Sequence, residues 1–204
     1  MLDFVSDNEN KKQKMMGYIA GLKAHLAGWQ RDYQSMMDFA NQAIENLPAN
    51  HWISGYCAMA MGVAFWGNGN LAAAKEAFTK AASIGKVSGH KRVAVASALY
   101  LGVSLELEGR LRQAVEHFQD SFQLAEQDGR ELPLAGYLHV DLARILYELN
   151  ELNLASQHLK EGIKLCQRLS DGRVEKIGHC LLARVYLAKG DFANASNSIQ
   201  NAEQ

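Results

Sequence analysis

A short turn phrase recurs five times along this chain of 204 residues. Each copy has a Gly or polar turn, then an apolar residue, then a further residue, usually small, three positions on. The copies are Arg31-Asp32-Tyr33 with Met36, Gly69-Asn70-Leu71 with Ala74, Gly109-Arg110-Leu111 with Ala114, Asn150-Glu151-Leu152 with Ala155, and Gly190-Asp191-Phe192 with Ala195. Their last residues are separated by 38, 40, 41 and 40 residues. A fixed period of this size is typical of repeat proteins, so the pattern favours a binding scaffold over an enzyme.

The residues between these phrases predict helices. Apolar residues recur at steps of three and four, as in Ala94, Ala98, Leu101 and Leu105. The only two prolines stand where one helix would end and the next begin. We expect an all-α chain with helices at 10–29, 33–47, 51–67, 71–85, 90–108, 111–127, 133–149, 152–169, 173–189 and 192–203.

Helices on either side of each phrase form an antiparallel pair. Gly69, Gly109 and Gly190 suit a left-handed C-cap, and Asn70 and Asp191 suit the N-cap of the next helix. Glycines within helices, such as Gly62 and Gly102, need a close helix contact as their reason, because Gly costs about 1 kcal/mol relative to Ala there. The prediction is a right-handed solenoid of five pairs, after a flexible segment 1–9. The repeats are expected at about 10–48, 51–86, 90–128, 133–170 and 173–204.

Charge and composition restrict the partners. Lys and Arg number 21 against 22 Asp and Glu, so no basic field favours nucleic acid. Residues 1–16 lack the apolar core of a signal peptide, and no apolar run approaches the roughly 20 residues that span a bilayer. Three cysteines without CxxC spacing do not suggest a disulfide framework. These features predict a protein of the cytoplasm without membrane contact.

The second-helix pattern resembles tetratricopeptide repeats. Leu101-Gly102 with Ala114, Phe118 and Ser121 matches the family's Leu-Gly first helix and small-large-small second helix, and Met61-Gly62 with Ala74, Phe78 and Ala81 matches as well. The period near 40 departs from the family's usual 34. It resembles instead the MalT-like repeat region of large, ATP-binding LuxR-type transcriptional regulators. The segment 132–152 carries this resemblance, followed by 155–162 and 182–191.

The resemblance implies a longer regulator with an upstream ATPase module and a C-terminal helix-turn-helix. No GxxxxGK[ST] occurs here, so we expect no cofactor in this segment and ATP only in a missing upstream module. The final helix, 192–203, exposes apolar residues such as Ile199 without a covering helix. We therefore interpret the chain as a fragment, with self-association through that helix as one expected consequence.

Residues capable of catalysis are not grouped. Histidines such as His139 and His158 are scattered without an HExxH or other ligand spacing, so no metal site is predicted. Cys180 lies beside His179 but at a periodic apolar position, which favours buried packing over reactivity. No GxSxG elbow is present, and we expect no catalytic residues and no enzyme activity.

First helices line the concave side of such solenoids, and their inner positions are the predicted binding site. The candidates are Tyr56, Trp66, Glu106, Tyr137, Arg144, Tyr147 and Arg184. Aromatic rings beside arginines would suit a peptide, a sugar or a small anionic effector. Val63, Leu99, Val103 and Val140 on the same helices are interpreted as core. A surface ion pair between Arg144 and Glu148, four residues apart, would explain both residues without a ligand.

Two hypotheses follow. The first is a non-catalytic, signal-sensing domain of a LuxR-type regulator. This domain would bind a small-molecule inducer or a protein partner. The second is a general tetratricopeptide adaptor that binds a partner's peptide.

Overall fold

The structure is a computed structural model that describes residues 2–127, 129–169 and 172–203, with side chains from Glu9 onward. Ten α-helices make up most of this part of the chain. Their bounds are α1 Leu2–Trp29, α2 Tyr33–Asn46, α3 Trp52–Gly67, α4 Leu71–Val87, α5 Lys91–Leu107, α6 Leu111–Ser121, α7 Ala135–Glu148, α8 Leu152–Gln167, α9 Gly172–Ala188 and α10 Phe192–Glu203. The predicted all-α repeat fold of the solenoid class is confirmed.

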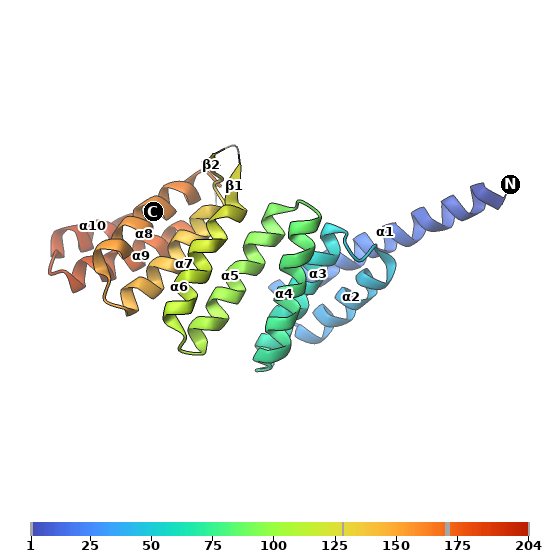
Figure 1. Cartoon of the computed structure of the whole chain (residues 1–204), viewed down its shortest axis with the longest axis horizontal. Coiled ribbons are helices and arrows are strands. Elements are labelled where there is room, and N and C mark those ends of the chain that lie inside the picture. The colour runs from blue at the N-terminus through green and yellow to red at the C-terminus, as the bar shows by residue number, and fades with distance from the viewer. Residues whose placement is uncertain (1, 128, 170–171, 204) are drawn as a thin grey trace. The chain divides into compact units, whose positions relative to one another are not determined.

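The helices belong to two compact units, which we describe separately. Unit 1 runs to Leu101 and unit 2 starts at Gly102, so the division falls within α5. In unit 1, α1 packs against α2 and α3 against α4, while α3 also contacts α1 and α2. In unit 2, α7 packs against α8 and α9 against α10, with α8 and α9 in contact. Each unit is therefore built from helix pairs joined by short turns (Figure 1).

All five turn phrases adopt the same backbone geometry. Their first residues have positive φ angles, between 58 and 78°, at Arg31, Gly69, Gly109, Asn150 and Gly190. The next residue then donates its N–H to a carbonyl five positions back, as Asn70 does to Phe65 at 2.8 Å. This bond satisfies a carbonyl that the helix end would otherwise leave without a partner.

Side-chain caps begin three of the second helices. The Asn70 side chain accepts the N–H of Ala73, and Asp191 accepts that of Asn194, both at 3.1 Å. Asp32 does the same for Ser35 at 3.1 Å. The predicted caps at Asn70 and Asp191 are thus confirmed, and each supplies an acceptor that the first helical turn lacks.

Two mid-helix glycines pack against phenylalanine rings. A Cβ on Gly62 of α3 would collide with the ring of Phe78 on α4, and a Cβ on Gly102 of α5 would collide with Phe118 on α6. Both rings are fully buried. The close helix contact predicted at these two glycines is therefore present in both units, and it explains why the helices contain glycine there.

The two units differ in what fills their cores. The buried clusters between α1, α2 and α3 consist mainly of alanines with Met36 and Cys57. Unit 2 instead buries large aliphatic residues completely, among them Leu138, Leu142, Ile145 and Leu159. Large apolar side chains thus occupy the interior of unit 2 to a greater extent than the space between the first helices of unit 1.

Three boundaries differ from the sequence prediction. Helix α1 begins at Leu2, so the segment 1–9 predicted as flexible is helical from that residue on. Helix α6 ends at Ser121, not near 127, and a 3₁₀ turn, Phe122–Ala125, follows it. The strands β1, Glu126–Gln127, and β2, Arg130–Glu131, then pair antiparallel. The sequence Asp128-Gly129 is a hairpin signal, and φ is +71° at Gly129.

Candidate functional site

An apolar pocket opens on the first helices of unit 1. Its volume is about 420 Å³, within the usual range of ligand pockets. Helices α1 and α3 supply most of the lining, and α2 and α5 add one residue each. The lining residues are Tyr18, Gly21, Leu22, Ala24, His25, Gly28, Trp29, Met36, Trp52, Ile53, Tyr56, Cys57, Met59, Ala60, Val63 and Tyr100.

Stacked aromatic rings fix one wall of this pocket. The Trp52 ring stacks on His90, with 4.8 Å between centroids and 8° between planes. Tyr56 meets Trp52 edge to face at 5.8 Å, and it meets His90 in the same way at 5.8 Å. The His51 ring also lies against Trp52, with 5.8 Å between their centroids. These contacts hold the Trp52 and Tyr56 rings in place before any ligand arrives.

The pocket lining carries no Asp, Glu, Lys or Arg. Helix α3 as a whole has no charged side chain of these types. Burial raises the pKa of the Tyr56 phenol and raises that of the Cys57 thiol to about 12. Both groups are therefore neutral near pH 7, and the Cys57 thiol is not a nucleophile. The pocket is suited to apolar and aromatic groups without charge.

A group of charged side chains occupies the inner face of unit 2. The Arg144 guanidinium on α7 pairs with Glu106 on α5 and with Asp141 one turn earlier, at 3.0 Å in the second case. Burial raises the pKa of Asp141, and Arg144 opposes that rise. Burial alone would lower the pKa of Arg144, but Asp141 and Glu106 outweigh it and the pKa is raised. Arg144 is consequently held as a cation between two carboxylates.

A second contact involves Arg184 of α9. Its guanidinium carbon lies 4.6 Å from the centroid of the Tyr147 ring, which is cation–π geometry. The same guanidinium lies 3.7 Å from a carboxylate oxygen of Glu148. The alternative ion pair between Arg144 and Glu148 is replaced by other pairs, because Arg144 pairs with Glu106 and Asp141, and Glu148 with Arg184. With both arginines engaged, an anionic effector at these positions loses its expected recognition groups.

The predicted site residues are only partly brought together. Tyr56 lines the pocket of unit 1. Trp66 is not a lining residue, but it packs edge to face on Phe78 and on the lining residue Tyr100. Tyr137 is half-buried on α7. The remaining candidates form the ion pairs and the cation–π contact of unit 2; they are Glu106, Arg144, Tyr147 and Arg184. The prediction missed the residues of α1 that line the pocket, although their spacing of three and four was a signal.

Two burial predictions need correction. Val140 is buried as expected, but Val63, Leu99 and Val103 are only half-buried, and Val63 lines the pocket. Cys180 is exposed and not packed in the core. Apolar periodicity identifies the helices, but it does not indicate which side of a first helix the next pair covers.

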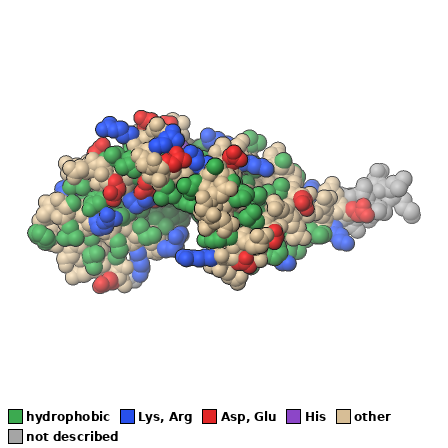
Figure 2. Space-filling view, turned by 90° about the horizontal axis from the view of Figure 1, so that it is seen from below, with side chains coloured by type: hydrophobic (Ala, Val, Ile, Leu, Met, Phe, Trp, Pro, Cys, Tyr) green, Lys and Arg blue, Asp and Glu red, His purple; other side chains and the backbone are tan. Residues whose placement is uncertain are grey.

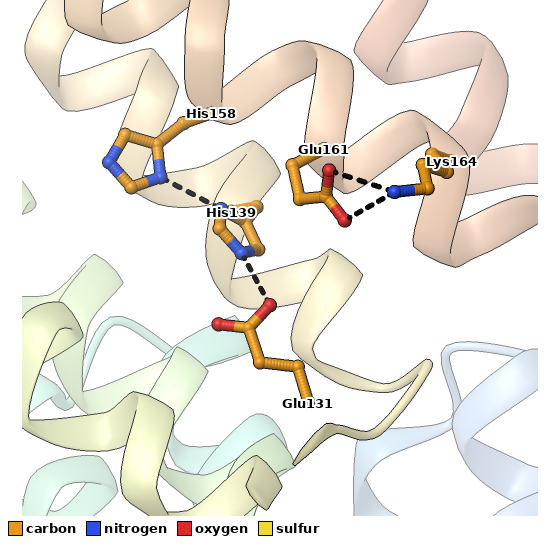
Figure 3. A network of polar contacts seen from close by, with 5 residues as sticks. All are labelled: Glu131, His139, His158, Glu161 and Lys164. Atoms are coloured by element: carbon orange, nitrogen blue, oxygen red, sulfur yellow. Dashed lines mark hydrogen bonds and ion pairs between the residues drawn. The ribbon is translucent and has the colours of Figure 1, made fainter. Parts of the chain in front are cut away.

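Three polar residues that seemed scattered in the sequence meet beside α7. The Nδ1 atoms of His139 and His158 lie 2.8 Å apart, and His139 Nε2 lies 3.2 Å from Glu131 of β2. Figure 3 shows His139 between the other two, with the surface pair Glu161 and Lys164 nearby. Burial and the neighbouring His139 lower the pKa of His158. The antiparallel packing of α7 on α8 could have indicated that the two histidines face each other.

Other classes of site lack support within the described part of the chain. No group of three or more His, Cys, Asp or Glu side chains there is arranged to hold a metal ion. None of the described helices has both the length and the apolar character that crossing a bilayer requires.

On the face in Figure 2, hydrophobic side chains are exposed between charged ones in both units.

Solved structures with a similar fold include two Rap proteins in complexes. One is the Rap conjugation gene regulator of plasmid pLS20 in complex with the Phr* peptide, which is 18% identical in sequence with a TM-score of 0.72. The match covers 91% of this chain and 52% of the regulator's chain. A Rap protein complexed with competence and sporulation factor is 12% identical, with a TM-score of 0.74 and coverage of 92% and 54%. The chain thus spans about half the length of these Rap proteins.

A pilF structure from Pseudomonas aeruginosa is also similar, at 14% identity and a TM-score of 0.71, with coverage of 95% of this chain and 78% of the other. Identities this low show the fold alone. No curated protein sequence matches the chain. A family model described as the MalT-like TPR region matches residues 17–204. The chain therefore belongs to the family of MalT-like tetratricopeptide regions.

Proposed function

We propose that this chain is the signal-sensing and partner-binding repeat region of a LuxR-type transcriptional regulator, without catalysis of its own. One observation carries the binding role: the charge-free aromatic pocket on α1 and α3 of unit 1. Family membership supports the regulator context, since regions of this type belong to such regulators. A cytoplasmic location is part of the proposal, and the three free cysteines are compatible with a reducing compartment.

The regulator context is tested on the gene. Its reading frame should continue upstream into a P-loop ATPase module and downstream into a basic helix-turn-helix, and ATP would bind only in the upstream module. A frame that encodes neither would remove the regulator assignment and leave the repeat fold.

The binding role is tested with the whole chain and its Tyr56→Ala variant. Removal of the Tyr56 ring opens the pocket wall, so the variant should lose retention of the natural partner or inducer. Tyr147→Ala in unit 2 is the matched control and should retain it. Equal retention by both variants would contradict the pocket as the binding site.

A general peptide-binding adaptor is the second candidate function. Two solved structures of this fold are complexes, one with the Phr* peptide and one with competence and sporulation factor. An adaptor would bind a partner segment without any ATPase or DNA-binding module in the same gene. A flanking frame without these modules, together with peptide binding that Tyr56→Ala abolishes, would favour the adaptor.

A further inference from the structure

An uncovered apolar stripe runs along α1 beside the pocket. Ile19, Leu22, Leu26 and Trp29 follow at steps of three and four residues and are 47, 67, 57 and 78% exposed. Leu22 and Trp29 also line the pocket, so stripe and pocket form one surface. Large contiguous apolar surfaces of this kind mark interaction sites in soluble proteins.

The length of the stripe indicates the kind of occupant. From Ile19 to Trp29 it covers nearly three helical turns, about 15 Å at the usual rise per residue. A small molecule in the pocket would leave most of the stripe in water. A partner helix of similar length would cover the stripe and insert one large side chain into the pocket, which is how a helix-in-groove complex places its anchor.

Basic side chains border this surface on α1. Lys12 lies two turns before Ile19, where the stripe begins, and Lys23 lies one turn before Leu26, at the edge of the stripe. Both lysines are exposed. Lys23 also lies over the Phe39 ring, with its ammonium 5.4 Å from the centroid.

A further basic residue, Arg92 of α5, acts on the pocket residue Tyr56. Burial raises the pKa of Tyr56, while the nearby Arg92 guanidinium on α5 acts in the opposite direction. Arg92 is exposed to solvent. The helices α1 and α5 thus carry exposed cations, while the pocket lining itself has no Asp, Glu, Lys or Arg.

Among the side chains that the structure describes, from Glu9 onward, acidic residues are few on the first helices of unit 1. Among the described side chains of α1, α3 and the unit 1 part of α5, five lysines and one arginine stand against a single acid, Glu9. The other described acidic residues of this unit lie on α2, at its cap, or on α4. They are Asp32, Asp38, Glu45 and Glu76.

From this distribution we infer that the inner face of unit 1 binds an amphipathic helical segment of a protein partner, with a large apolar side chain in the pocket and acidic side chains along its flanks. The inference rests on the proposed binding role and names the chemistry of the partner. Opposite charge on the flanks would favour association and set the orientation of the segment.

Two synthetic peptides test the charge of the partner. They share an apolar face of leucines with one phenylalanine anchor, and their flanks carry glutamates in one peptide and lysines in the other. Fluorescence anisotropy with the whole chain at low salt should show about tenfold tighter binding of the glutamate peptide, from a few exposed charge pairs. The advantage should shrink at about 1 M salt, where the Debye length is about 3 Å.

Charge-reversal variants locate the effect. Lys12→Glu with Lys23→Glu should remove the preference for glutamate, while Lys80→Glu on α4 should leave it unchanged. Lys12→Glu alone, at an exposed position, should reduce the preference and serves if the double variant does not fold. An unchanged preference in these α1 variants would overturn the inference.

Pocket variants locate the anchor. Val63→Asp places a charge in the pocket and should abolish binding of the glutamate peptide, as should replacement of the peptide's phenylalanine by alanine. Val103→Asp, one repeat later and outside the pocket lining, should retain binding. Binding that survives Val63→Asp would overturn the inference.

The remaining outcomes separate the inference from the proposed function. Equal affinity for both peptides, lost in Val63→Asp, would overturn the acidic partner and leave the binding role intact. Binding of neutral N-phenyl-1-naphthylamine in the pocket without binding of either peptide would overturn the inference in favour of a small-molecule site. Binding of neither peptide nor this probe would count against the inference and the binding role together.

Discussion

The two units use the same turns and helix pairs but finish their inner faces differently. In unit 1, alanines fill the space between α1, α2 and α3, while large apolar side chains of α1 lie exposed around a pocket without charges. In unit 2, leucines and isoleucines are fully buried, and arginines on the first helices pair with carboxylates. One repeat framework can therefore leave apolar surface available for a partner or use it for the core.

The largest test of this comparison is a pair of truncations at equivalent positions. Leu142 of α7 is fully buried, whereas Met61 of α3 is only half-buried. Leu142→Ala should lower the free energy of unfolding by about 2–5 kcal/mol, and Met61→Ala by clearly less, because less buried volume is removed. Urea unfolding of the whole chain measures both. Equal losses would show that the two cores are packed alike.

Alanine at the helical glycines should affect both units similarly. Helix propensity alone would make Gly62→Ala and Gly102→Ala stabilising by about 1 kcal/mol. Because the new Cβ collides with Phe78 or Phe118, we expect instead a destabilisation of about 1–3 kcal/mol in each case. Thermal melts of the two variants measure the sign. A gain in stability at either position would mean that the phenylalanine ring moves aside easily.

Acid should destabilise the chain mainly through the His158 cluster of unit 2. Burial, and then His139, lower the pKa of His158 in the fold from 6.5. The unfolded chain therefore binds more protons, and the free energy of unfolding should fall as pH drops below about 6.5, until the folded-state pKa is reached. Urea midpoints between about pH 7.5 and 5 measure this dependence.

Two glutamine variants assign the pH dependence to a unit. His158→Gln should flatten it, because glutamine does not titrate. Burial and Lys14 also lower the pKa of His51 in unit 1, but His51→Gln should flatten the dependence less, because that ring is less buried. A larger change from His51→Gln would reverse this assignment.

The smallest expected effect concerns the cation–π contacts, of which each unit has an example on a first helix. Arg184→Ala removes the contact with Tyr147 and the pairing with Glu148, both near the surface. Lys23→Ala removes the contact with Phe39. Each should cost no more than about 1 kcal/mol in urea unfolding. A loss of several kcal/mol for Arg184→Ala would give this contact a structural role that unit 1 lacks.

The fold was predictable because its signals are local. The turn phrases contain the residues that cap and reverse the helices, and Gly62 and Phe78 show their contact through fixed spacing from one turn. The ion pairs were not predicted correctly, since Glu148 was considered only as a neighbour of Arg144 on the same helix. Arg144 instead pairs with Glu106, and these two residues lie 38 positions apart in the sequence, close to one repeat period. The period itself was therefore the signal for contacts between successive first helices.

The pocket was harder to predict for a physical reason. Tyr56, Met59 and Val63 follow from the register of α3, but Leu22 and Trp29 contribute only because of how α1 is placed against that helix. Alanine-rich packing sets this placement, and small residues give no distinctive pattern in the sequence. The hairpin after α6 was missed because the predicted helix was extended to residue 127, through the 3₁₀ turn Phe122–Ala125 and the strand β1.

The uniform turns also bear on how such a chain diversifies. Arg31 and Asn150 adopt the same backbone conformation as the three turn glycines, so the junction between paired helices does not depend on one residue type. A gene segment of one period, duplicated or exchanged at these junctions, would join helices that already fit. New recognition surfaces would then arise by recombining whole repeats, while point substitutions refine the side chains on the first helices.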